Sequence, residues 1–354
     1  MPGQPCGCPE HFPNFRKLSC RKFQGNGSIC KSHLQMHYAT GGTDLEEEAM
    51  SQYPWTPERE VSTDEAAALI RSQFPDIPCT KIAHLGEGWD FFVFVVDEEI
   101  AFRFPKKAIV DQCAERELLL LDRLPADLPI AVPRPLYRGQ PGNAYPWHFW
   151  GYRMLVGEPL PYVRISEPRK LYIAERVGEF LGILHATDGE GLPLSVWDTD
   201  DDDAPPHFEV RALLEATREV YPAPLFRRCT EYLSSPDCVP RDYTGERKQI
   251  HADLLADHIL VDPKSFVLTG IIDWGDATAG DPAGDFVGIW MWGSDAALEA
   301  ALAAYSGKLD PGARRRIRHR GTLIAMEDVH YATKTQRPEL LQAGLATLER
   351  ELLR

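Results

Sequence analysis

Two acid-bearing loops set between short apolar runs, in the stretch 249–289, constrain this chain more than any other feature. The first loop, residues 251–258, is closed by the apolar run 259–261, and a second apolar run covers 267–272 and ends at Asp273. Short apolar runs of this kind, bounded by turn residues, are typical of buried strands. An arrangement of strand, loop and strand would bring three polar side chains of the first loop to one place: His251, Asp253 and His258.

Length and charge limit the classes of protein to consider. With 354 residues the chain can form two lobes, because domains typically hold roughly 100 to 200 residues. A formal net charge of −15 argues against a nucleic-acid-binding protein, whose footprint would be basic, and suits cationic ligands. The sequence has no apolar run near the roughly 20 residues that span a bilayer and no apolar signal-peptide core. We therefore expect a cytoplasmic protein with neither nucleic acid nor membrane as partner.

The N-terminal segment 1–49 is expected to be a disordered extension. It is rich in Gly, Pro, Ser and Lys, ends in a Glu run and shows no sustained periodicity. Four of the eight cysteines lie within it: Cys6, Cys8, Cys20 and Cys30. A zinc cluster is the alternative, but these cysteines match no usual spacing of zinc ligands. Met50 could be the natural start of the protein.

A glycine-containing hairpin follows the first expected helix. Residues 62–74 begin with Ser-Thr-Asp-Glu and predict that helix. Three strands are expected after it: 81–85, 90–96 and 99–104. The turn between the first two strands contains Gly86 and Gly88, whose backbone could lie close over the phosphates of a nucleotide. Many hairpins turn on glycine, so this signal is weak by itself.

An isolated arginine, Arg103, stands inside the apolar run of the third expected strand. A buried charge needs a partner, and the expected helix 114–124 carries Glu115 and Glu117. An ion pair between Arg103 and a glutamate of this helix would hold a cation over nucleotide phosphates. The alternative is an arginine on the solvated face of an edge strand.

A hinge and a mainly helical region come next. The expected strand 149–156 ends at Gly157, and exposed backbone at such a hinge could pair with a purine edge. Helical spacing of apolar residues predicts six helices beyond it: 170–185, 210–220, 223–233, 296–305, 311–328 and 338–353. We interpret His185 as a packed core residue and the basic cluster 314–320 as the surface of a helix.

The two acid-bearing loops can be interpreted as phosphoryl-transfer machinery. A carboxylate in a loop can orient an attacking hydroxyl and accept its proton, and a second carboxylate after a nearby strand can bind Mg²⁺ that bridges nucleotide phosphates. Asp253 suits the first role and Asp273 the second. Kinases place a metal-binding Asn five residues after the catalytic Asp. Here that spacing is kept, but His258 occupies the position.

The chain resembles the aminoglycoside phosphotransferase family, antibiotic kinases with a protein-kinase-like fold, over residues 61 to about 345. The matching segments are LGEGWD (85–90), AFRFPK (101–106), AERELLLLDRL (114–124), GYRMLVGEPL (151–160), HADLLADHIL (251–260) and IIDWGDATAGDPAGDF (271–286). The last two together are specific. The resemblance implies an α+β, bilobal fold with a small β-rich nucleotide-binding lobe over 61–156. A larger, mainly helical catalytic and substrate-binding lobe would cover 157–354.

Site residues can be carried over position by position. The resemblance implies that Asp253 is the catalytic base and that His258 and Asp273 hold Mg²⁺, while His251 organises the loop. It further implies that ATP or GTP is bound by residues of the N-terminal lobe. The phosphates would be bound by Gly86, Gly88 and Arg103, with Glu117 as the partner of Arg103. The purine would be bound by the backbone around 153–156, including Arg153 and Leu155.

Three positions depart from the family pattern. Ala252 replaces the usual Gly, which we interpret as a mild change, and Arg103 replaces the more familiar Lys, which keeps the charge on a planar fork. His258 replaces Asn, and imidazole is a softer ligand for Mg²⁺ than an amide oxygen. A histidine at this position also occurs in the branches that resemble 2''-aminoglycoside kinases and macrolide kinases. The substitution therefore indicates these branches.

The leading hypothesis is a nucleotide-dependent O-phosphotransferase that acts on a cationic, hydroxylated, aminoglycoside-like small molecule and confers antibiotic resistance, as a monomer or weak dimer. Three acids after Asp273 add to the acidic balance: Asp276, Asp281 and Asp285. The last two could equally be structural, and we expect Asp281 to cap a helix that begins at Pro282. A macrolide kinase, a metabolic kinase for an amino alcohol or sugar, and a nucleotide-binding pseudokinase are the alternatives.

Overall fold

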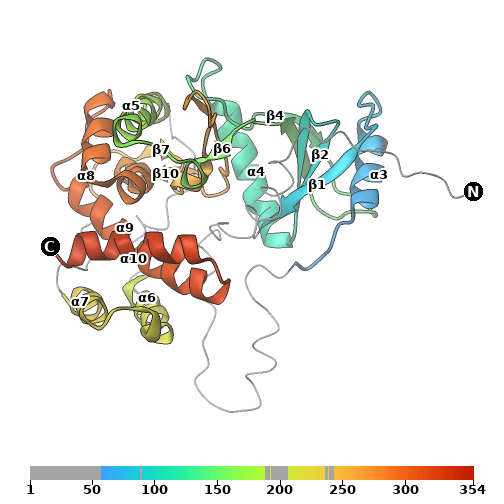
Figure 1. Cartoon of the computed structure of the whole chain (residues 1–354). Coiled ribbons are helices and arrows are strands. Elements are labelled where there is room, and N and C mark those ends of the chain that lie inside the picture. The colour runs from blue at the N-terminus through green and yellow to red at the C-terminus, as the bar shows by residue number, and fades with distance from the viewer. Residues whose placement is uncertain (1–56, 88–89, 188–191, 193–205, 236–237, 239–242) are drawn as a thin grey trace, which may run out of the picture. The chain divides into compact units, whose positions relative to one another are not determined.

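The computed structural model describes residues 57–87, 90–187, 192, 206–235, 238 and 243–354 (Figure 1). The extension expected at 1–49, with its four cysteines, and Gly88 of the hairpin turn lie outside the described residues. The chain divides into two compact units. The first consists of the chain up to Asp122 together with Pro133–Leu155, and the second of Arg123–Val132 together with Val156–Arg354.

A five-stranded antiparallel sheet forms the centre of the first unit, in the order β1-β2-β3-β5-β4. Its strands are β1 (Ile82–Glu87), β2 (Phe91–Val96), β3 (Ile100–Pro105), β4 (Pro135–Gly139) and β5 (Phe149–Arg153). Two helices belong to the unit, α3 (Thr63–Gln73) and α4 (Ala108–Arg123). The Ser62 side chain accepts a hydrogen bond from the Glu65 amide and caps α3, as the sequence predicts.

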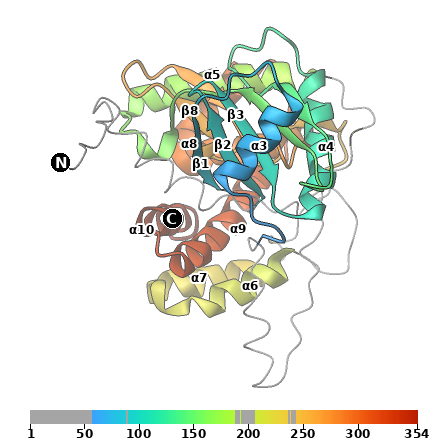
Figure 2. The same cartoon turned by 90° about the vertical axis from the view of Figure 1, so that its right-hand side faces the viewer.

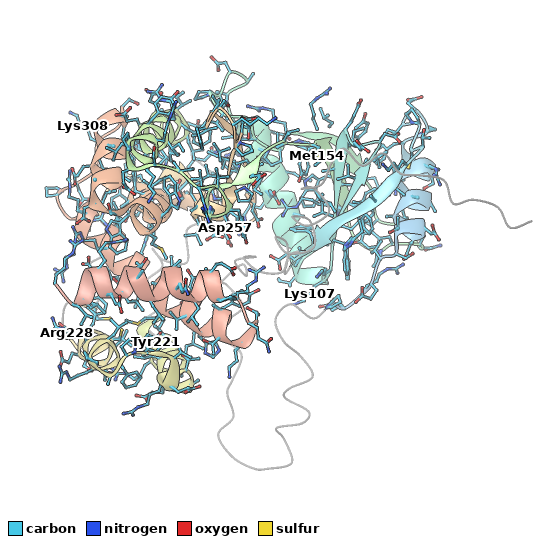
Figure 3. All side chains as sticks on the ribbon, in the orientation of Figure 1. Lys107, Met154, Tyr221, Arg228, Asp257 and Lys308 are labelled. Carbon is cyan, nitrogen blue, oxygen red and sulfur yellow. The ribbon has the colours of Figure 1, made fainter. Side chains whose placement is uncertain are left out.

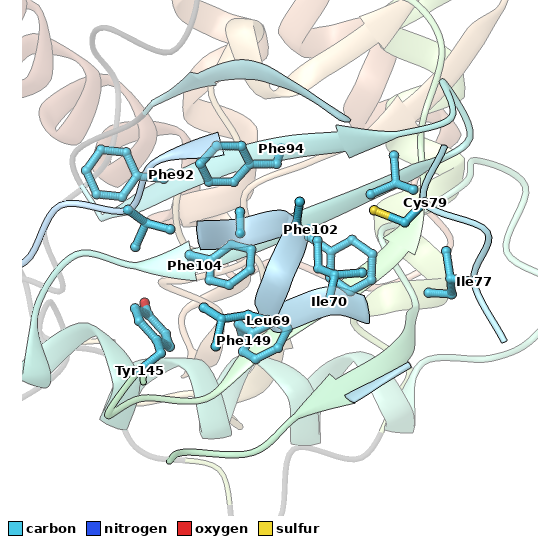
Figure 4. Close-up of a cluster of buried hydrophobic side chains, with 14 of the residues drawn as sticks. Leu69, Ile70, Ile77, Cys79, Phe92, Phe94, Phe102, Phe104, Tyr145 and Phe149 are labelled. Carbon is cyan, nitrogen blue, oxygen red and sulfur yellow. The ribbon is translucent and has the colours of Figure 1, made fainter. Parts of the chain in front are cut away.

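Both faces of the sheet are buried, which explains why β2 is an uninterrupted apolar run. On one face Phe94, Phe102 and Phe149 pack with residues of α3 such as Ile70 (Figure 4). On the other face alternate strand residues pack with α4: Phe91, Val93, Val95, Ala101 and Trp150 meet Val110, Ala114 and Leu118. The helix begins six residues before its expected start, since this contact overrides the strand-like composition of Ile109 and Val110.

The second unit is mainly helical, and short strands and 3-10 turns frame its loops. Its helices are α5 (Glu167–Leu184), α6 (Pro206–Ala216), α7 (Ala223–Leu233), α8 (Val287–Ala304), α9 (Ala313–Lys334) and α10 (Pro338–Leu352). Its strands form two sheets, β6 (Glu158–Pro159), β8 (Ile259–Val261) and β9 (Leu268–Ile271) in one, β7 (Lys248–Ile250) and β10 (Thr278–Gly280) in the other. The 3-10 turns are η2 (Leu160–Tyr162), η4 (Arg218–Val220), η6 (Ala256–His258) and η7 (Pro282–Phe286). Helices α6 and α7 lie beside α9 and α10 (Figures 1 and 2).

The fold class agrees with the expectation, an α+β chain with a β-rich N-terminal part and a mainly helical C-terminal part. α8 is kinked at Ser294, and its second part corresponds to the helix expected from 296, whereas its first part, from Val287, was not expected. Its first turns are apolar all round and therefore carry no amphipathic period. Within the described ranges, none of the helices is both long enough and apolar enough to cross a membrane.

The interpretation of the basic cluster 314–320 as a helix surface is wrong at two positions. Arg316 and Arg320, one helical turn apart on α9, have side chains that are only 11% exposed. Arg316 forms ion pairs with Asp281 and Asp310. Arg314 does lie on the surface, where it pairs with Glu299. A dense run of arginines looks solvated in the sequence, and only the acidic partners on other segments explain why two of them are buried.

Close contact between α5 and α8 gives a first test of the packing. A Cβ added to Gly178 of α5 would lie 2.1 Å from the carbonyl oxygen of Ala301 on α8. We expect Gly178→Ala to lower the free energy of unfolding by about 1–3 kcal/mol, because backbone must move apart. Urea denaturation measures it. Gly142→Ala, with nothing within 4 Å of its added Cβ, is the matched control, and equal effects of the two variants would contradict the contact.

Candidate functional site

The loop that carries Asp253 is fixed at both ends by strands. β7 pairs with β10, with Ile250 opposite Thr278, and β8 begins immediately after His258. Gly288, in the first turn of α8, lies against the middle of the loop, where an added Cβ would be 2.1 Å from the carbonyl oxygen of Leu254. The loop backbone is therefore held by neighbours on three sides.

Asp285 of η7 binds the start of this loop directly. Its Oδ2 accepts a hydrogen bond of 2.8 Å from the His251 amide, and its Oδ1 accepts one of 2.8 Å from the Ala252 amide. The Nε2 of His185 donates a third, of 3.0 Å, to Oδ2. Burial alone would raise the pKa of the Asp285 carboxyl, but these bonds and the histidines hold it below its usual range. The carboxylate is thus a fixed anchor for the loop.

Asp285 was not singled out by the sequence, which left open a role in attracting cations or a structural one. Its side chain is fully buried, so the first role is wrong. The sequence signal that could have indicated a buried role is the apolar run 286–291 directly after this acid. Arg103 was recognised in the same way, as a charge next to apolar residues. His185 is a packed core residue, as expected, and Asp281 caps η7 by accepting a hydrogen bond from the Ala283 amide, also as expected.

Ala252 has a left-handed backbone conformation, with φ of 67°. Glycine adopts this region freely, whereas a side chain there costs about 1–2 kcal/mol. The two hydrogen bonds of Asp285 to this and the preceding amide help to hold the strained residue in place. The exchange of Gly for Ala is therefore less mild than the sequence suggested.

His258 connects the candidate base with the candidate metal ligand. Its Nδ1 donates a hydrogen bond of 2.7 Å to the carbonyl oxygen of Asp253 and lies 3.6 Å from the Asp253 carboxylate. Its Nε2 lies 3.7 Å from Oδ2 of Asp273. Asp253, His258 and Asp273 therefore converge, although Asp273 is 20 residues away from Asp253 in the sequence.

The surroundings of His258 are strongly negative. η6 also carries Asp257, which is labelled in Figure 3 and immediately precedes His258. Burial by itself would lower the pKa of His258, but the carboxylates of Asp257, Asp253 and Asp273 raise it to about 10. Because Nδ1 is engaged with a carbonyl, the titrating proton is on Nε2, the atom that faces Asp273. A metal ion bound between His258 and Asp273 would therefore have to displace the proton on Nε2.

The turn after β9 presents Asp273 in a strained conformation. Asp273 has φ of 65°, and its side chain is 35% exposed. The next residue, Trp274, is fully buried, donates from its indole nitrogen to the carbonyl of Ile271 and packs on the His251 ring at 4.6 Å. His251 Nε2 donates to the carbonyl of Ile272. His251 and Trp274 therefore join the Asp253 loop to the Asp273 turn.

The donor atoms fit a divalent cation of the kind expected. Asp273 offers a partly exposed carboxylate, and Nε2 of His258 becomes a second ligand once the metal ion displaces its proton. Mg²⁺ commonly takes one or two protein ligands while phosphates and water complete its shell. Among the described residues no group of three or more His, Cys, Asp or Glu side chains is arranged to hold a metal by itself. The two-ligand arrangement agrees with an ion that would be bound together with nucleotide phosphates.

The first unit contains the expected ion pair. Nη1 of Arg103 lies 2.6 Å from Oε1 of Glu117, and both side chains are buried. The Arg103 guanidinium also stacks on the ring of Phe91 at 3.9 Å. Its strand β3 lies between β2 and β5, so the alternative of a solvated edge strand is wrong. The pair holds a positive charge in a fixed position within the sheet.

The other predicted nucleotide residues are placed at two ends of this sheet. Gly86 is buried in β1 beside a register shift in its pairing with β2. Arg153 is the last residue of β5, and the following Met154 amide donates to the carbonyl of Glu99. Leu155 is the last residue of the first unit. Their roles in nucleotide binding remain predictions.

Replacing Asp285 tests the loop anchor. In Asp285→Asn one carboxylate oxygen becomes an amide donor, so one of the two loop amides loses its acceptor. We expect the free energy of unfolding to fall by about 1–3 kcal/mol and turnover to fall with it. Denaturation and steady-state kinetics measure both. Asp262→Asn is the control, since this exposed acid caps a turn through the Lys264 and Ser265 amides, which Asn can also do.

His251 gives a prediction about pH. Burial lowers its pKa to about 4, and its Nδ1 has no hydrogen-bond partner among the described residues. We expect ¹⁵N NMR to show a neutral ring with the proton on Nε2 down to about pH 5. The unfolded chain takes up this proton at higher pH, so stability contributed by His251 should be lost as pH falls from about 6.5 towards 4. A ring that titrates near pH 6.5 in the folded protein would contradict the burial.

Comparison with known proteins identifies the family. Residues 81–319 match the family model described as the phosphotransferase enzyme family. No curated protein matches the chain. The GDP complex of wild-type aminoglycoside 2'-phosphotransferase-IIIa superposes with a TM-score of 0.61 and 24% identity, covering 83% of this chain and 99% of that one. The macrolide 2'-phosphotransferase MphH from Brachybacterium faecium superposes with a TM-score of 0.53 and 24% identity, covering 80% and 98%. The gentamicin complex of APH(2'')-IIa superposes with a TM-score of 0.54 and 20% identity, covering 82% of this chain and 96% of that one.

These structures include both expected branches and share the fold. The family match extends from the first strand of the β-rich unit through the Asp253 loop and the Asp273 turn to α9. The chain therefore belongs to the aminoglycoside phosphotransferase family and is a phosphotransferase that uses an alcohol group as its acceptor.

Proposed function

We propose that this protein moves the γ-phosphate of ATP or GTP to a hydroxyl of a cationic, aminoglycoside-like small molecule and thereby confers antibiotic resistance. The observation that carries the proposal is the convergence of Asp253 and Asp273 on the two ring nitrogens of His258. Phosphoryl transfer needs a group that orients the acceptor hydroxyl beside a cation site. In this proposal both lie in the second unit, on the anchored Asp253 loop and the Asp273 turn.

Asp253 takes the role of base. Its side chain is about one-tenth exposed, its loop is anchored by Asp285, and a carboxylate held in this way can orient a hydroxyl and accept its proton. Asp273 and His258 would hold Mg²⁺, which would neutralise charge on the transferred phosphoryl group. His258 contributes Nε2, and its hydrogen bond to the Asp253 carbonyl sets the direction of that nitrogen.

Nucleotide binding is assigned to the first unit. Arg103 attracts the phosphates, and Glu117 fixes the direction of its guanidinium. We assign the backbone at Gly86 to the phosphates and the backbone at Arg153 and Leu155 to the purine. The donor is ATP or GTP: similar structures include complexes with GDP and with streptomycin and ATP.

An aminoglycoside-like acceptor is supported by charge. The chain has a net charge of −15, and acids gather around the Asp253 loop, where they raise the pKa of His258. Similar structures carry kanamycin and gentamicin. We further propose a cytoplasmic monomer or weak dimer. A macrolide kinase is the second candidate, because macrolide phosphotransferases superpose over as much of the chain as aminoglycoside enzymes do.

An acceptor panel separates these candidates. The full chain would be incubated with labelled ATP or GTP, Mg²⁺ and either aminoglycosides or macrolides. We expect label transfer to at least one aminoglycoside. Transfer to macrolides alone would favour the second candidate, and transfer to neither class, with nucleotide still bound, would overturn the antibiotic assignment.

Asp253→Asn tests the base. We expect kcat to fall by about 10²- to 10⁴-fold, the usual contribution of general acid–base catalysis, while nucleotide affinity measured by calorimetry stays unchanged. The Asp262→Asn control, on an exposed turn of the same unit, should keep wild-type kcat. Normal turnover in Asp253→Asn would remove this residue from the mechanism.

A further inference from the structure

Two arginines of α9 hold the short segment that carries the loop anchor Asp285. Arg316 and Arg320 are four residues apart and therefore lie on the same face of the helix, and this face packs against η7. Both side chains are only 11% exposed. Neither belongs to the base, the metal ligands or the nucleotide residues assigned above.

Arg316 binds the N-terminal end of η7. Its Nε and Nη2 donate to the two oxygens of Asp281 at 2.7 and 3.1 Å, and its Nη1 donates to Asp310 at 2.9 Å. Asp281 is fully buried, and its Oδ1 also accepts from the Ala283 amide in the first turn of η7. A buried carboxylate in this position needs the bidentate cation. Hydrogen bonding to Arg316 also lowers the pKa of Asp310 to about 2.

Arg320 covers the middle of the same segment. Its Nη1 lies 3.9 Å from Asp281 and would be 2.6 Å from a Cβ added to Gly284. The arginine therefore passes close over the backbone one residue before Asp285. With one contact at residue 281 and another at 284, η7 is held at two points along its length.

The path continues from Asp285 to the reacting group. The two oxygens of Asp285 bind the His251 and Ala252 amides, and Ala252 is the strained residue directly before Asp253. A displacement of η7 would move these two acceptors, and the loop would lose the contacts that hold its left-handed residue. Displacements of about 1 Å at a reacting group can cost about 10²-fold in rate.

We propose that Arg316, supported by Arg320, is a positioning residue for Asp253. It acts through Asp281 and Asp285 on the backbone of the Asp253 loop, so that helix α9 contributes to turnover although it supplies no group to the reaction. The proposal rests on the role of Asp253 in the proposed function. It predicts an effect on kcat and on the loop amides, with little effect on nucleotide binding.

Arg316→Met and Arg314→Met form a matched pair on one helix. Arg314 binds Glu299 on the surface, so its replacement removes a charge without touching η7. We expect Arg316→Met to lower kcat at least about tenfold with nucleotide KM changed less than about twofold, and Arg314→Met to leave both unchanged. A folded Arg316→Met protein with wild-type kcat would overturn the proposal.

A conservative variant covers the case in which Arg316→Met fails to fold. Arg316→Lys keeps a cation beside Asp281 but cannot bind both of its oxygens and Asp310 in the planar arrangement of a guanidinium. We expect it to fold and to show a kcat between those of the wild type and Arg316→Met. A wild-type kcat in Arg316→Lys, together with unchanged exchange of the loop amides, would count against positioning by bidentate binding.

Hydrogen exchange separates this inference from the proposed function. In Arg316→Lys and Arg316→Met the His251 and Ala252 amides should exchange faster than in Arg314→Met, whether or not an acceptor for the wild type has been found. An inactive wild type with this exchange pattern would refute the proposed function alone. In a double-mutant cycle with Asp285→Asn the losses in kcat should be non-additive, and full additivity would show that Arg316 acts by another route.

Discussion

The carboxylate of Asp285 is the contact on which the catalytic part of this protein depends. It is fully buried, yet it is held charged by two backbone amides and the His185 ring. Those amides belong to His251 and Ala252, the two residues before Asp253. Ala252 has a left-handed backbone conformation, which a residue with a side chain normally avoids. A functional loop is thereby kept in a strained state by a buried anchor whose bonds favour that single arrangement.

Buried charge is used in the same way in both units. Arg103 and Glu117 form a pair inside the sheet, and Arg316 with Asp281 forms another between α9 and η7. Such pairs contribute little net stability compared with apolar residues of the same volume, but breaking one partner is costly. The first pair fixes the position of the Arg103 guanidinium. The second fixes η7, the segment that carries the loop anchor Asp285.

Much of the architecture could be predicted from the sequence, because local patterns carry it. The start of α3 follows from the Ser62 cap, and β2 and β3 follow from short apolar runs between turns. The start of α4 was predicted six residues late, because Ile109 and Val110 have a strand-like composition. The first part of α8 was missed because apolar residues on all sides hide its helical period. From strand–loop–strand order we expected His251, Asp253 and His258 to lie together, and the structure adds Asp273 on the other side of His258. The assignment of Arg316 and Arg320 to a surface failed because their partners lie on other segments.

By itself the sequence determined the class of fold, the family and the residues able to carry phosphoryl transfer, since these depend on residue type and local spacing. Tertiary structure alone decided which charges are buried and what they hold. Asp285 is 34 residues from His251 in the chain, and Arg316 is 35 residues from Asp281. Contacts over such separations leave no periodic signal in one sequence. They arise only when packing removes water from a carboxylate and requires a donor in its place.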